Sequence, residues 1–196
     1  EVKLNYNVFS SAWKMVRHAC ANPDLLVPIL GISWFWAIGT TYLTQLPVFT
    51  KEIIGGSEMV VTLFNGTFTI GVALGSFLCP YIVHFFEARR ISQWALAGVF
   101  LFGLDLCWMG YHFERPEADA LIGLVAFLSS SVDHVRITLD FLLMAFCGGV
   151  FIVPLYTQLQ INSPAIERAR TIASNNVMNA LFIATTFGIS SVLFAQ

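Results

Sequence analysis

One acidic residue interrupts the long apolar stretches of this sequence, and it is the clearest candidate for chemistry. Asp105 is the sole charged residue between Ile91 and Phe113. A carboxylate inside hydrocarbon is costly, so it should face other helices or water. Two interpretations stay open: a proton site, cation site or gate, or a carboxylate hydrogen-bonded to a neighbouring helix. No Lys or Arg lies three or four residues away along a helix, so the partner must come from another helix, from water or from another part of the protein.

Uncharged polar residues form a second set of candidates. Thr41 and Gln45 share one helical face, and so do Asn175 and Asn179, each pair at i, i+4 spacing. Such groups either line a water-filled path or hydrogen-bond between helices. We favour the first role for Gln45 and Asn179. The candidates for a substrate path or coupling site are therefore Asp105, Gln45, Thr41, Asn175, Asn179 and Tyr156.

Recognisable catalytic and metal-binding patterns are absent from the sequence. There is no Ser/His/Asp grouping, no HExxH, and no His followed by Asp at HxxxxD spacing. The four cysteines are widely separated and form no CxxC, which favours a packing role. The residues thus predict no enzyme activity, no metal and no cofactor.

The elements that must position these residues are membrane-spanning helices. Apolar residues make up 57% of the chain and charged residues 11%, against roughly 25% charged in an ordinary globular domain. Because about 20 apolar residues cross a bilayer as a helix, we expect an all-α polytopic bundle rather than buried soluble helices. The net charge of −2 implies no nucleic-acid partner. Five spans are predicted, at about 24–49, 59–85, 92–112, 138–159 and 169–196.

The remaining segments have their own patterns. Residues 1–22 place Tyr6, Phe9, Trp13 and Val16 at helical spacing beside basic residues, which predicts an amphipathic helix on the cytoplasmic face. Residues 120–131 are apolar but too short to span, and read as an interfacial or re-entrant piece. Within the spans, Gly71 and Gly75 at GxxxG spacing predict close helix packing. Pro154 predicts a kink in the fourth span.

The orientation follows from Lys and Arg, which concentrate on the cytoplasmic side of membrane proteins. With five spans, seven basic residues fall on one side: Lys3, Lys14, Arg17, Arg89, Arg90, Arg168 and Arg170. The other side holds three: Lys51, Arg115 and Arg136. The first side is therefore predicted to be cytoplasmic.

Three segments carry a resemblance to a known family. ILGISWFWAIGTTYLTQLPVFTKEIIGG (29–56), FGLDLCW (102–108) and GGVFIVPLYTQLQINSPAIERARTIASNNVMNALF (148–182) resemble the C-terminal half of the lysophospholipid transporters of the major facilitator superfamily. The resemblance is closest to versions fused to a glycerolipid acyltransferase and an acyl-acyl-carrier-protein synthetase. The usual Asp-Arg-x-Gly signature between the second and third spans is degenerate, with Gly75 and Glu87-Ala-Arg89-Arg90 remaining.

This resemblance implies a fold and a function. The five spans would be helices 7–11 of twelve, residues 1–22 the linker between two six-helix halves, and the chain would stop before the last helix. The implied activity is movement of lysophospholipid, chiefly lysophosphatidylethanolamine, across the bacterial inner membrane for re-acylation. The implied partners are the bilayer, the N-terminal six-helix half and the fused enzyme domains. Transport of another small amphiphile or metabolite, or a role as a membrane anchor for a fused lipid-acylating enzyme, remain alternatives.

Overall fold

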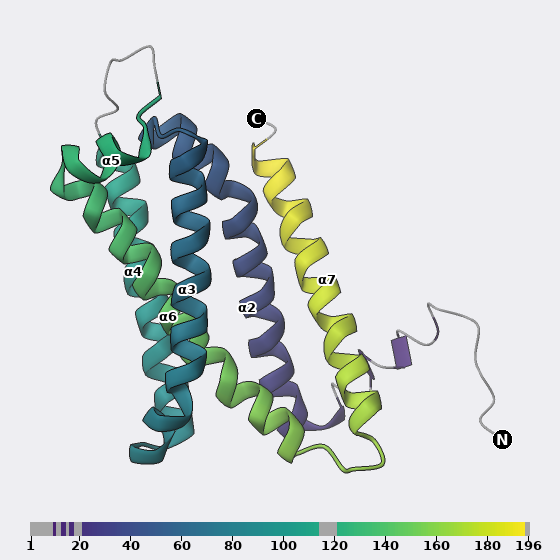
Figure 1. The fold of residues 1–196 in the computed structure, drawn as a ribbon. Helices are drawn as coiled ribbons and strands as arrows, with labels where there is room; N and C mark the ends of the chain where they lie inside the picture. The colour runs from purple at the N-terminus through teal and green to yellow at the C-terminus, as the bar shows by residue number, and fades with distance from the viewer. Residues whose placement is uncertain (1–9, 11–12, 15, 18–20, 114–120, 195–196) are drawn as a thin grey trace. The chain divides into compact units, whose positions relative to one another are not determined.

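The computed structural model describes residues 10, 13–14, 16–17, 21–113 and 121–194, and these residues are almost entirely helical. No β-strand occurs within these ranges. The elements are α2 (Pro23–Val48), η1 (Phe49–Ile54), α3 (Glu58–Phe85), α4 (Ala88–His112), α5 (Leu124–Ser130), α6 (Val132–Ile161) and α7 (Arg168–Phe194), shown in Figure 1. The prediction of an all-α fold is confirmed.

Four helical segments of the described chain are long and apolar enough to cross a membrane. They are 23–53, 58–85, 88–112 and 132–161. The protein is therefore a multi-pass membrane protein. The segment predicted as a fifth span forms α7, which is long enough but does not belong to this apolar set. Its polar residues, among them Ser174, Asn175 and Asn179, lower its hydropathy.

The chain divides into two compact units. The first comprises residues 1–41 and 155–196, and the second comprises residues 42–154. Two helices contribute to both: α2 passes from the first unit into the second, and α6 begins in the second and ends in the first. The division in α6 falls directly after Pro154, a residue that cannot donate the usual helical hydrogen bond.

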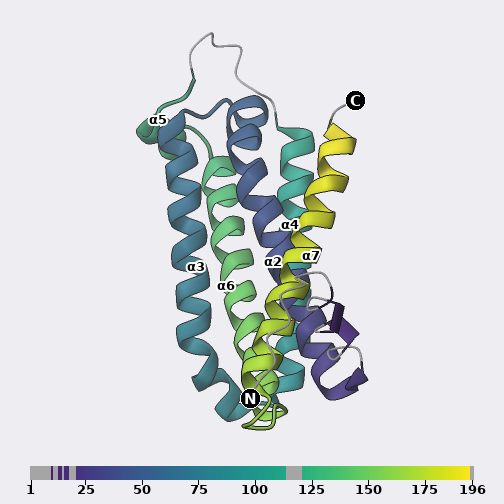
Figure 2. The same cartoon turned by 90° about the vertical axis from the view of Figure 1, so that its right-hand side faces the viewer.

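Glycines bring α3 and α6 into close contact within the second unit. A Cβ atom on Gly75 would lie 2.1 Å from the carbonyl oxygen of Phe146, and one on Gly71 would lie 2.6 Å from that of Leu142. Gly149 of α6 is equally close to α3, because its Cβ would lie 2.4 Å from the carbonyl oxygen of Val72. Figures 1 and 2 show the two helices side by side from perpendicular directions. The predicted close packing at Gly71 and Gly75 is confirmed.

Aromatic side chains fill the centre of the second unit. Phe64 of α3 stacks on Phe141 of α6, with ring centroids 4.7 Å apart, and meets Phe127 of α5 edge to face at 5.6 Å. All three side chains are buried. The segment predicted as interfacial or re-entrant thus forms the seven-residue helix α5, which contributes Phe127 to this core.

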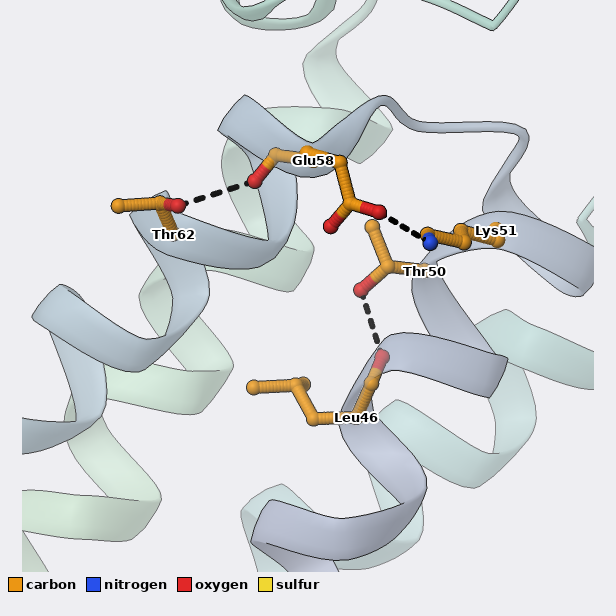
Figure 3. A network of polar contacts seen from close by, with 5 residues as sticks. All are labelled: Leu46, Thr50, Lys51, Glu58 and Thr62. Atoms are coloured by element: carbon orange, nitrogen blue, oxygen red, sulfur yellow. Dashed lines mark hydrogen bonds and ion pairs between the residues drawn. The ribbon is translucent and has the colours of Figure 1, made fainter.

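The connection between α2 and α3 is a tightly bonded turn. The helix continues past Val48 as the π-helical η1, so residues 50–54 are helical rather than part of the predicted loop. Gly55 ends it with φ of 73°, a conformation that glycine adopts without strain. Lys51 and Glu58 form an ion pair across the turn, while Thr50 donates to the carbonyl of Leu46, as Figure 3 shows. Ile122 donates to the carbonyl of Gly55 at 2.8 Å, which ties the segment before α5 to this turn.

The helix predicted as the fourth span begins earlier than expected. α6 begins at Val132 rather than near Thr138, so Asp133 and Arg136 are helical and not part of the connection before it.

The amphipathic segment 1–22 is described only in part. Lys3, Tyr6 and Phe9 lie outside the described residues. Trp13, Lys14, Val16 and Arg17 are helical, and Trp13 is exposed.

Candidate functional site

An ion pair between two span-length helices is the centre of the candidate site. Arg136 of α6 donates from Nη2 to Oδ1 of Asp105 in α4 at 2.6 Å, and from Nε to Oδ2 at 3.0 Å. This fork-to-fork geometry fixes both the distance and the orientation of the two groups. The partner of Asp105 therefore comes from another helix, which is one of the sources that the sequence left open.

A second carboxyl group lies beside this pair. Asp140 follows Arg136 by four residues, so both occupy one face of α6. Its residue is only 6% exposed, whereas the side chains of Asp105 and Arg136 are 28% and 50% exposed. Asp140 interacts electrostatically with Asp105, Arg136 and the Tyr42 hydroxyl. Among the described residues, its buried Oδ2 has no hydrogen-bond partner.

We call Asp105, Arg136 and Asp140 the charge cluster. Asp140 lies about 12 Å along the axis from the start of α6, and Asp105 about 10 Å from the end of α4. Both acids are thus inside the span-length helices, about two turns from the nearest helix end. Ionised groups at such depth are expensive unless they are paired, and they commonly mark ion or proton pathways.

The local sequence explains why α6 begins early enough to carry this cluster. Ser131 Oγ accepts a hydrogen bond at 3.1 Å from the backbone N–H of Asp133, which satisfies one of the free donors at the helix start. Asp133 also places negative charge in the first turn, where the helix dipole favours it. The helix consequently extends through Arg136 and Asp140 before the uninterrupted apolar run begins.

The cluster holds two acids and one permanent cation. When both carboxyls are ionised, it carries one excess negative charge. Binding of one proton or one monovalent cation would neutralise it, and release would restore the charge. That is the change an ion-coupled mechanism needs. Among the described residues, no group of three His, Cys, Asp or Glu is arranged to hold a metal ion.

The other predicted site residues separate between the two units. Gln45 is half-buried in α2 and belongs to the second unit together with Asp105. Thr41, Tyr156, Asn175 and Asn179 all belong to the first unit. Thr41 donates to the carbonyl of Ala37 in its own helix at 2.9 Å. The six residues therefore do not form one site within either unit.

In the first unit, polar side chains connect α2 with α6 and α7. Ser33 Oγ donates to Asn179 Oδ1 at 2.8 Å, and Trp36 Nε1 donates to the Tyr156 hydroxyl at 3.0 Å. Asn175 is 1% exposed, and its Oδ1 has no hydrogen-bond partner within the described part of the chain. Asn179 and Tyr156 thus take part in hydrogen bonds between helices.

A histidine and serine pair escaped the sequence analysis. Ser130 Oγ and His134 Nδ1 lie 2.8 Å apart at i, i+4 spacing, beside a cavity of about 710 Å³ bordered by α4, α5 and α6. In a nucleophilic dyad the base is itself oriented by a third group. The Nε2 atom of His134 has no such partner among the residues described. The spacing of Ser130 and His134 was visible in the sequence. The sequence did not show that Ser130 ends one helix, α5, and that His134 lies in the first turn of the next, α6.

Comparisons with known proteins leave the family open. The chain matches no protein-family model, and no curated protein or solved structure matches it significantly.

Proposed function

We propose that the chain is part of an ion-coupled membrane transporter, with the charge cluster as its coupling site. The observation that carries this proposal is the juxtaposition of Asp105, Arg136 and buried Asp140 on two span-length helices. A purely structural role would be served by uncharged packing at a lower desolvation cost. A cluster with one excess acid offers a titratable charge instead.

We also propose an architecture and a substrate for the protein to which this chain belongs. α7 would be a fifth span, and the chain would correspond to helices 7–11 of a major-facilitator-type protein in the bacterial inner membrane. The resemblance of residues 29–56, 102–108 and 148–182 to lysophospholipid transporters supports a lysophospholipid as substrate. Alternating access in such folds needs two halves that rock about a site between them. The second half would supply part of the binding site.

Arg136 is a basic residue within a span-length helix, where it could in principle meet a lipid phosphate. The spans predicted from the sequence contain no Lys or Arg that could meet a phosphate. With α6 beginning at Val132, Arg136 lies inside a span-length helix. Its Nε and Nη2 groups donate to Asp105, so we assign Arg136 to the charge cluster rather than to a head group.

The test measures lysophospholipid movement by the full gene product that carries this chain. The protein is reconstituted into vesicles, and fluorescent lysophosphatidylethanolamine in one leaflet is followed by a membrane-impermeant quencher. The proposal expects protein-dependent movement that exceeds protein-free vesicles. Movement of a small metabolite without lysophospholipid movement would overturn the substrate. Absence of any transport, with lipid acylation retained by the same protein, would favour a membrane anchor.

A further inference from the structure

A second cavity lies where α3 ends and α4 begins, away from the charge cluster. It has a volume of about 530 Å³, within the range of roughly 300–1,000 Å³ that is usual for small-molecule sites. Its floor is formed by Ile91 and Ala95 of α4 and Val150 of α6, all of which are buried. Phe86 and Trp94 also line it, and both are largely exposed. We call this cavity the apolar groove.

The surroundings of the apolar groove favour lipid as its neighbour. α3, α4 and α6 are three of the helices that are long and apolar enough to cross a membrane. In a bilayer, the outward surface of such helices would meet acyl chains rather than water. Trp94 lies near the first residues of α4, and tryptophan is enriched at the level of lipid head groups. The groove is thus recessed apolar surface beginning near one membrane boundary.

A cation marks one end of the apolar groove. Arg90 lines it, and Arg89 precedes Arg90 in the first turn of α4. Glu87 accepts from Arg90 Nε at 3.1 Å, but both side chains are more than 70% exposed, so this pair is weak. Two guanidinium groups against one carboxylate leave a net positive charge at the helix start. Guanidinium groups bind phosphate oxygens in a bidentate manner.

We propose that the apolar groove binds one acyl chain of an anionic phospholipid from the bilayer, with the lipid phosphate held by Arg90. The apolar lining selects a hydrocarbon chain. The cation at its end selects an anionic head group, because basic pockets between membrane helices attract such lipids. This proposal concerns a resident bilayer lipid and does not depend on transport activity.

Trp94 provides a direct reporter of occupancy. The full gene product is reconstituted with every tryptophan except Trp94 replaced by Phe, among them Trp13, Trp34, Trp36 and Trp108, so that fluorescence comes from Trp94. Brominated phosphatidylglycerol is compared with brominated phosphatidylcholine at equal mole fraction in unbrominated phosphatidylcholine vesicles. We expect the anionic lipid to quench with an apparent affinity about fivefold higher, the factor that corresponds to about 1 kcal/mol per basic residue near a membrane.

Variants at the helix start separate a site from ordinary lipid contact. Arg90→Gln should abolish the preference for the anionic lipid, and Arg90→Lys should retain most of it. Arg168→Gln is the matched control, since it removes the same charge from the exposed start of α7 and should change nothing. In the unsubstituted Arg90 protein, high salt should weaken the preference, which provides a measurement that does not require a variant to fold.

Three results would overturn the proposal. Equal quenching by the two lipids would show that Trp94 contacts bulk lipid without selection. A preference that persists in Arg90→Gln would place the anionic head group elsewhere. Absence of quenching by either lipid would show that protein, not lipid, covers the apolar groove.

Discussion

At the scale of single residues, Asp140 differs in its burial from the other acids that the structure describes. It is 6% exposed and lies one helical turn from Arg136, whose guanidinium group already pairs with Asp105. One cation therefore serves two acids. We infer that Asp140 is the group whose charge changes during function, while Asp105 and Arg136 hold the local geometry.

Removal of Arg136 tests whether the cluster is electrostatically coupled. Arg136→Gln leaves Asp105 and Asp140 close together without a cation, so the repulsion between them should lower stability in detergent. Adding Asp105→Asn removes one of the two acids and should recover part of the loss. Thermal unfolding of the two single variants and the double variant measures this. Additive effects would contradict the coupling of these residues.

The sequence identified Asp105 but not its partners, for a physical reason. Asp105 stands alone in an apolar stretch, so its cost in hydrocarbon was evident. Arg136 lies before the predicted fourth span, 138–159, where charges usually indicate a loop, and Asp140 lies at the edge of that span. The Ser131 cap and the helical start at Val132 place them inside the helix. Helix boundaries are the least reliable part of sequence reasoning, and here a boundary concealed the site.

At the scale of elements, the contact between α3 and α6 depends on the absence of side chains. Gly75→Ala would place a methyl group 2.1 Å from the carbonyl oxygen of Phe146, so the backbones must separate. We expect a loss of about 1–3 kcal/mol in the free energy of unfolding, typical of overpacking. Gly66→Ala in the same helix is the control, since nothing lies within 4 Å of its Cβ position. It should be neutral or stabilise by up to about 1 kcal/mol.

Chemical or thermal unfolding of both glycine variants in the same detergent gives the comparison. Equal effects of Gly66→Ala and Gly75→Ala would contradict the close approach of α3 and α6. The GxxxG spacing was sufficient to predict this contact, although the motif is common. The motif does not specify which helix packs against it, so it could not identify α6 as the partner.

The hydrogen bond between Ser33 and Asn179 makes a prediction for the first unit. Ser33 is fully buried and donates to Asn179 Oδ1 at 2.8 Å. Ser33→Ala removes the donor, and interhelical hydrogen bonds in membranes are worth about 0.6 kcal/mol on average and up to about 1.7. We expect a loss in that range by unfolding in detergent. An unchanged stability would favour a water-lined role for Asn179.

The polar stripe of α7 was predicted from the sequence, but its effect on the hydropathy of that helix was not. Asn175 and Asn179 were expected to share a face, and both lie on α7. The same polar residues keep α7 outside the set of helices that are apolar enough to span on composition alone. A fifth span at α7 therefore stays a prediction, because its length fits a span and its composition alone does not identify one.

At the scale of the whole molecule, the topology follows from the distribution of Lys and Arg. A cysteine in place of Lys51 should react with an impermeant maleimide in intact cells, because Lys51 is predicted to be extracytoplasmic. A cysteine in place of Arg89 should react only after permeabilisation. The background lacks Cys20, Cys79, Cys107 and Cys147. The opposite labelling pattern would show that the orientation is wrong.

The central claim is that the charge cluster couples transport to an ion gradient, and Asp140→Asn tests it most directly. The full gene product is reconstituted, and substrate movement is measured with and without an imposed proton or sodium gradient. Asp24→Asn, which changes an exposed acid at the start of α2, is the matched control. We predict that Asp140→Asn still moves substrate but no longer responds to the gradient, while Asp24→Asn responds normally. A full gradient response in Asp140→Asn would contradict the claim.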